Sequence, residues 1–113
     1  MEHDLFTIQD LTLREEIWFS DRFALLGKLK GCTPLDTKYG NPSRENYVAE
    51  YELGQIFMSY GLPIGVCVDG HYWFSFGHDF SRTTMEYCLR WCGFGVKTRR
   101  QMLKSGAAGW LHV

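Results

Sequence analysis

The chain has 113 residues, of which 45% are apolar and 22% charged, and its formal net charge is −1 at neutral pH. This composition is typical of a globular protein and excludes a disordered chain. The small net charge excludes a general attraction to nucleic acid or anionic membranes. The length is that of one domain, so we expect a single globular domain over residues 1–113.

Signal and cysteine patterns favour a cytoplasmic protein. No N-terminal stretch has the basic, apolar and small-residue order of a secretion signal. No apolar run approaches the ~18 residues needed to span a bilayer. The four cysteines (Cys32, Cys67, Cys88 and Cys92) do not form a disulfide framework, and a chain of this size builds a core without one. We therefore expect reduced cysteines, a cytoplasmic location and no membrane partner.

The first half of the chain predicts helices. A short strand is expected over residues 5–8. Thr12 and Glu15 have the spacing of a capping box, which predicts a helix over 12–30, with a break at Ser20-Asp21.

The next segment predicts a loop and then a longer helix. Glycines and prolines predict a loop over 31–42. Ser43 then precedes a predicted helix over 44–60, ended by Gly61. The helix rests on the i, i+4, i+7, i+8, i+11 spacing of its apolar residues, which are Ala49, Leu53, Ile56, Phe57 and Tyr60.

The dipeptide Asp69-Gly70 lies between two apolar runs and predicts a β-hairpin over about 64–76. A two-residue type I′ turn requires positive φ at both positions, which this dipeptide tolerates. The expected register places Val68 opposite His71 and Val66 opposite Trp73. Both faces of the hairpin are apolar, so either both are covered or one meets a partner.

The C-terminal segment predicts two helices and a strand. Ser81 or Thr83 caps a helix through Cys92, ended by the glycines of 93–95. A short basic helix over 96–104 follows, ended by Gly106, and then a strand over 109–113. The expected fold class is therefore α+β: a small domain whose central hairpin is extended by terminal strands and packed by three to five helices.

The cysteines of the predicted helix suggest a metal site. Cys88 and Cys92 share one helix face, and His71 and His78 would complete a zinc site. A helical C-x₃-C lacks the tight C-x₂-C turn of structural zinc sites, and free cysteine commonly packs as a small apolar residue. We expect a core pair, with no metal and no cofactor.

A second group has the residue types of a catalytic site. His78-Asp79 follows the hairpin, and Cys67 or Ser75 would serve as the nucleophile. The expected register points Cys67 and His71 to opposite faces, and no signature of a nucleophile turn is present. We therefore expect a protein that is not an enzyme.

The basic helix suggests nucleic-acid binding. With its predecessor it resembles a helix-turn-helix, whose second helix would present Lys97, Arg99, Arg100 and Lys104. Leu89 stands where the motif needs a small residue, which favours an ordinary solvated helix. Nucleic-acid binding is kept as the first alternative.

Aromatic residues make up 16% of the chain, with four Trp, six Tyr and eight Phe. A domain this small has few interior positions, so we expect some rings to be exposed and to bind a partner. Acidic side chains would steer a basic groove of that partner. The predicted partner-binding residues are Tyr72, Trp73, Phe74, Tyr39, Tyr47, Asp36, Glu45, Glu50 and Glu52.

The favoured function is a non-enzymatic inhibitor or adaptor that occupies a surface of another protein. In general character the chain resembles the small single-domain inhibitors and adaptors that phages and mobile elements encode. This resemblance is compositional and rests on no motif. The alternatives are a nucleic-acid-binding regulator that uses the basic helix, and a zinc- or thiol-dependent protein that uses Cys88 and Cys92.

Overall fold

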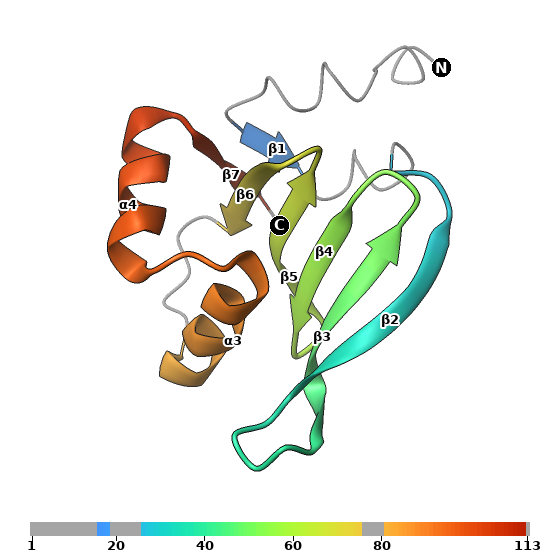
Figure 1. Cartoon of the computed structure of the whole chain (residues 1–113). Helices are drawn as coiled ribbons and strands as arrows, with labels where there is room; N and C mark the ends of the chain where they lie inside the picture. The colour runs from blue at the N-terminus through green and yellow to red at the C-terminus, as the bar shows by residue number, and fades with distance from the viewer. Residues whose placement is uncertain (1–15, 19–25, 76–80, 113) are drawn as a thin grey trace.

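A computed structural model describes residues 16–18, 26–75 and 81–112 of the chain. Within these ranges the chain forms seven strands and two helices (Figure 1). In chain order they are β1 (Glu16–Trp18), β2 (Leu29–Asp36), β3 (Pro42–Tyr51), β4 (Gln55–Ser59), β5 (Leu62–Val68), β6 (His71–Ser75), α3 (Arg82–Cys92), α4 (Val96–Ser105) and β7 (Ala108–His112).

The strands form one mixed sheet in the order β1-β7-β6-β5-β4-β3-β2. Strands β2 to β6 pair antiparallel in sequence, whereas β7 pairs parallel with β6 and β1 pairs parallel with β7. Parallel neighbours need a long crossover connection. Helices α3 and α4 supply it, and both lie on the same side of the sheet (Figure 1).

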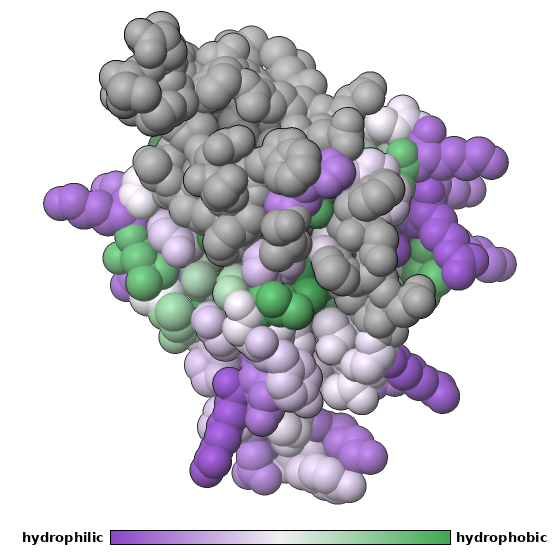
Figure 2. Space-filling view, turned by 180° about the vertical axis from the view of Figure 1, so that it is seen from behind, coloured by the Kyte–Doolittle hydropathy of each residue, from purple (hydrophilic) through white to green (hydrophobic). Residues whose placement is uncertain are grey.

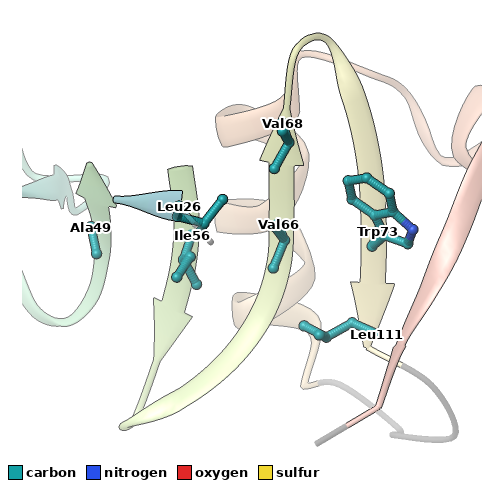
Figure 3. Close-up of a cluster of buried hydrophobic side chains, with 7 residues drawn as sticks. All are labelled: Leu26, Ala49, Ile56, Val66, Val68, Trp73 and Leu111. Atoms are coloured by element: carbon teal, nitrogen blue, oxygen red, sulfur yellow. The ribbon is translucent and has the colours of Figure 1, made fainter. Parts of the chain in front are cut away.

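The centre of the sheet is buried on both faces. One cluster packs under the helices and consists of Phe57, Ile64, Phe74, Tyr87, Cys88, Cys92 and Ala108. A second cluster lies on the opposite face (Figure 3) and consists of Leu26, Ala49, Ile56, Val66, Val68, Trp73 and Leu111. Successive side chains of a strand point to opposite faces, so a strand that is buried on both faces can carry large apolar residues at consecutive positions.

The expected small sheet packed by three to five helices is wrong. The predicted helix over 12–30 contains β1 and the start of β2 in its described parts, and the predicted loop over 31–42 is largely β2. The predicted helix over 44–60 is β3, a turn and β4. The described residues therefore form a seven-stranded sheet with two helices on one face.

The error over 44–60 has a physical cause in Gly54 and Gly61. The segment contains β-branched and aromatic residues such as Val48 and Phe57, which favour strands. Gly54 lies in the β3–β4 turn, where an added Cβ would stand 2.5 Å from the carbonyl oxygen of Cys67. Gly61 does not end a helix: with φ of 76° it forms the β4–β5 turn together with Tyr60, whose φ is 52°.

The hairpin predicted over about 64–76 is confirmed as β5 and β6. Val68 pairs with His71, and the next pairs follow the expected register. Asp69 and Gly70 have φ values of 51° and 78°, the positive values that a type I′ turn requires. A local turn signal therefore predicted this part of the sheet correctly.

The predicted C-terminal elements are also confirmed. Ser81 caps α3 and Gly93 ends it, α4 ends at Gly106, and β7 follows as the last strand. In the described ranges, neither helix has the length and apolar character needed to cross a membrane. The predicted strand over 5–8, the capping box of Thr12 and the break at Ser20-Asp21 lie outside the described residues.

Candidate functional site

A cleft of about 760 Å³ lies between the β2–β3 turn and α3. This volume falls within the range of about 300–1,000 Å³ that is typical of ligand sites. Four of the helix residues are spaced i, i+3, i+4, i+7 and so share one helix face. The lining residues are Thr37, Lys38 and Tyr39 of the turn, and Thr83, Glu86, Tyr87, Leu89 and Arg90 of the helix.

The turn wall of the cleft is ordered by Thr37. Its hydroxyl accepts hydrogen bonds from the backbone N–H groups of Tyr39 and Asn41, both at 3.3 Å. Gly40, with φ of 82°, donates its N–H to the Thr37 carbonyl at 3.0 Å. A threonine that caps its own turn fixes the backbone around it. Tyr39 is thereby presented at the tip with 78% of its surface exposed.

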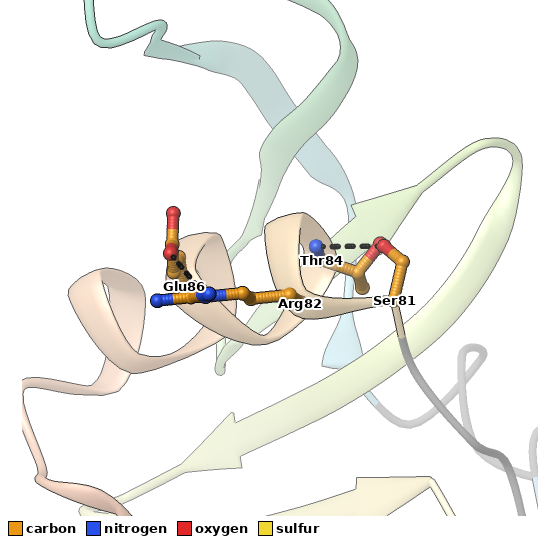
Figure 4. Close-up of polar contacts among 4 residues, drawn as sticks. All are labelled: Ser81, Arg82, Thr84 and Glu86. Atoms are coloured by element: carbon orange, nitrogen blue, oxygen red, sulfur yellow. Dashed lines mark hydrogen bonds and ion pairs between the residues drawn. The ribbon is translucent and has the colours of Figure 1, made fainter.

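The helix wall begins at a well-formed N-cap. The Ser81 hydroxyl accepts the backbone N–H of Thr84 at 3.0 Å (Figure 4). Arg82, the next residue, pairs with Glu86 one turn further along the helix, at 3.6 Å on the exposed surface. The one carboxylate on the helix wall is therefore already partnered by a cation.

A buried hydrogen-bond chain joins the helix wall to the sheet. Ser81 donates to the Thr84 hydroxyl at 3.0 Å, and Ser59 of β4 donates to Asn46 Oδ1 of β3 at 2.7 Å. The hydroxyls of Thr84 and Ser59 lie 3.3 Å apart. Since the Ser59 proton is engaged with Asn46, Thr84 is the donor between them.

The same chain continues along β3 toward the hairpin end. Asn46 Nδ2 donates to Ser43 Oγ at 3.3 Å, and Ser43 reaches Glu45 Oε2 at 3.5 Å. Every bond therefore runs in one direction, from the cap of α3 to a carboxylate on β3. A satisfied network of this kind fixes the positions of the elements that it connects.

The cleft carries positive charge beside aromatic rings. Arg90 Nη2 donates to the carbonyl of Asp36 at 2.7 Å, and its guanidinium lies 4.6 Å from the Tyr87 ring centroid. The Lys38 ammonium lies 5.2 Å from the ring of Tyr39. Such cation–π contacts keep the charged heads beside apolar surface.

The structure separates the predicted aromatic anchors. Trp73 and Phe74 are completely buried, so neither is available to a partner. Tyr72 is half-buried and meets Phe94 edge-on at 5.0 Å, and Tyr47 packs against the cluster opposite the helices. Of the predicted anchors, Tyr39 is the one that the structure leaves exposed.

The predicted acidic residues are exposed but do not gather on one surface. Hydrophilic side chains cover the end where the β2–β3 hairpin extends, at the bottom of Figure 2. Asp36 lies at that end of β2, whereas Glu45 and Glu50 on β3 are five residues apart and point to opposite faces. Glu52 lies in the β3–β4 turn and accepts the N–H of Lys28 at 2.8 Å.

The predicted basic residues of α4 divide into two kinds. Lys97, Arg100 and Lys104 are exposed, and their spacing places them on one side of the helix. Arg99 is half-buried, with its guanidinium 4.8 Å from the ring of Phe74. Burial lowers the pKa of Arg99. This side chain belongs to the packing between α4 and the sheet.

The residues of the predicted zinc site are not brought together. His71 packs against Trp73 at 4.4 Å, whereas Cys88 and Cys92 belong to the cluster under the helices. His78 lies outside the described residues. Among the residues described, no three His, Cys, Asp or Glu side chains are arranged to hold a metal ion.

The two helical cysteines nevertheless influence each other. Their mutual hydrogen bond lowers the pKa of Cys92 to about 7, and the Phe94 N–H and the Arg99 guanidinium act in the same direction. The same hydrogen bond, together with burial, raises the pKa of Cys88. Burial also raises the pKa of Cys67.

The predicted catalytic set is likewise divided by the sheet. Cys67 pairs across the strands with Tyr72, and His71 pairs with Val68 one position further along, so the two side chains point to opposite faces. Ser75 is buried on β6. Asp79 lies outside the described residues.

Sequence reasoning missed the helix wall of the cleft, formed chiefly by Thr83, Glu86 and Arg90. Their spacing on the predicted helix was a usable signal, because it places polar side chains on one face. The β2–β3 turn faces them across the cleft, and it is held there by a hydrogen bond between Arg90 and Asp36, which are 54 residues apart. No protein-family model, curated protein or solved structure matches the chain.

Proposed function

We propose that this protein is a non-enzymatic inhibitor or adaptor that acts in the cytoplasm by occupying a surface of a partner protein. The observation that supports the proposal is the exposed ring of Tyr39, held on an ordered turn beside a cleft. Tyrosine and arginine are prominent among binding hot spots. Here Tyr39 and Arg90 lie on opposite walls of the same cleft.

The test uses a purified partner. Proteins captured by the wild-type chain from a lysate of its source cells are produced separately and titrated by calorimetry. We expect Tyr39→Ser to weaken the complex about tenfold or more, which corresponds to about 1.4 kcal/mol. The control is Val96→Ser, which removes an exposed apolar side chain from α4 and should leave the affinity unchanged. Equal loss in both variants, or no purified partner that binds, contradicts the proposal.

A second candidate function is nucleic-acid binding through α4. It is favoured by the exposed stripe of Lys97, Arg100 and Lys104. Each phosphate contact on duplex DNA contributes a slope of about −0.9 to the dependence of log affinity on log salt, so three contacts predict roughly −3. A salt titration with a labelled duplex measures this slope. Binding that does not change with salt rules out the second candidate.

A further inference from the structure

The charges lining the cleft are unequal. Lys38 and Arg90 contribute two cations. The hydrogen bond to Asp36 uses one of the five N–H donors of Arg90, and the others have no carboxylate partner among the described residues. Among the described residues of the lining, Glu86 is the one carboxylate, and Arg82 pairs with it on the exposed helix surface.

Two side chains that line the cleft, Tyr87 and Leu89, also belong to the apolar core. Tyr87 is 7% exposed and Leu89 is half-buried, and both pack into the cluster between α3 and the sheet. The guanidinium of Arg90 lies over the Tyr87 ring. A ligand therefore meets the cationic heads of Lys38 and Arg90, the half-buried side chain of Leu89 and the exposed ring of Tyr39.

From this arrangement we propose that the cleft binds an acidic, extended segment of the partner protein. One carboxylate of that segment pairs with Arg90 and Lys38, and a neighbouring apolar side chain packs on Leu89 and on the exposed ring of Tyr39. Arginine suits this role because its planar fork binds a carboxylate through two parallel hydrogen bonds. The inference rests on the proposed function and adds the chemistry of the partner.

A nucleic-acid strand is a poorer occupant of the same cleft. Its affinity comes mainly from several phosphate contacts with cations, whereas two cations, Lys38 and Arg90, lie beside apolar side chains in the lining. A peptide can use both features, with a carboxylate for the cations and an apolar side chain for the apolar residues. The lining therefore favours a peptide.

The inference is tested with two synthetic peptides, acetylated, amidated and fluorescently labelled. One has the sequence DEWLDE and the other KRWLKR. The labelled peptide is held at a low concentration and titrated with the protein. We expect fluorescence anisotropy to detect binding of the acidic peptide with a dissociation constant of about 1 mM or lower. We expect the basic peptide to bind at least about tenfold more weakly.

The variants locate the binding to the cleft. Arg90→Gln and Lys38→Gln should each weaken the acidic peptide, Arg90→Gln by about tenfold. The matched control removes the same charge from the start of β2, as Lys30→Gln, and should have little effect. Thermal unfolding verifies that Arg90→Gln is folded, and Lys38→Gln tests the inference even where the loss of the Asp36 contact disturbs the turn.

Three outcomes overturn the inference: equal binding of both peptides, no binding of the acidic peptide at about 1 mM, or preferred binding of a single-stranded oligonucleotide that Arg90→Gln abolishes. Failure here is distinguishable from failure of the proposed function. If Tyr39→Ser weakens binding to the purified partner and Arg90→Gln does not, the result supports the partner-binding function and contradicts the binding of an acidic segment in the cleft.

Discussion

The centre of the sheet and the β2–β3 hairpin use aromatic residues in opposite ways. On β6, Trp73 and Phe74 point to opposite faces and both are completely buried. On the β2–β3 turn Tyr39 is 78% exposed, and β2 is exposed along nearly its whole length. A central strand has neighbours on both sides and a cluster on each face, whereas β2 is an edge strand. The composition of the chain sets how many aromatic rings it has, and the topology decides which of them are exposed.

The largest effect that tests this contrast is expected at Trp73. Trp73→Ala removes a fully buried ring from the cluster opposite the helices and should lower the free energy of unfolding by about 3–5 kcal/mol. Urea denaturation followed by far-UV circular dichroism measures it. A loss below about 1 kcal/mol contradicts the burial of this ring.

An intermediate effect is expected at Gly54. The Cβ of Gly54→Ala would stand 2.5 Å from the carbonyl oxygen of Cys67, so β4 and β5 must shift, at a cost of about 1–3 kcal/mol. Gly31 on β2 is the matched control, because an added Cβ there meets nothing within 4 Å. Gly31→Ala should leave stability within about 0.5 kcal/mol of the wild type. Equal effects in the two variants would show that the β3–β4 turn is packed no more tightly than the edge strand β2.

A similar effect is expected from the hydrogen-bond chain. Ser59→Ala leaves Asn46 Oδ1 and the Thr84 hydroxyl without their shared partner in a buried site, which should cost about 1–3 kcal/mol. The control Ser105→Ala removes an exposed hydroxyl and should change stability by less than about 0.5 kcal/mol. Identical melting curves for Ser59→Ala and the wild type would mean that these hydrogen bonds do not help to hold the helix against the sheet.

The smallest effect on folding is expected at the hairpin tip. Tyr39→Ala removes a ring that is mostly in solvent, so the free energy of unfolding should change by less than about 0.5 kcal/mol. The same urea titration measures it. A larger loss would show that the ring of Tyr39 is a folding element, and the contrast with Trp73 would disappear.

The sequence predicts those parts of the fold whose signals are local. The turn at Asp69-Gly70 needs positive φ at two adjacent residues, and the ends of α3 are marked by Ser81 and Gly93. Each of these constraints involves residues close together in the chain. Sequence reasoning therefore recovered β5, β6 and the two helices.

The segment over 44–60 shows where local reasoning fails. The spacing of Ala49, Ile56 and Phe57 fits one face of a helix, yet the same residues point to different faces of two strands. The hydrogen bonds that stabilise β3 and β4 join these two strands to each other and to β2 and β5. The spacing of apolar residues does not reveal these pairings. The cleft is non-local for the same reason, because its walls lie about fifty residues apart in the chain.

The unidirectional row of hydroxyl and amide donors from Ser81 to Glu45 has a consequence for recognition. Asn46 Oδ1 and the Glu45 carboxylate can only accept, so they fix the direction of the hydrogen bonds from Ser59 and Ser43. These hydrogen bonds hold the first turn of α3 against β3 and β4. A cleft wall that is already ordered loses little conformational entropy when a ligand binds, so more of the contact energy remains as affinity.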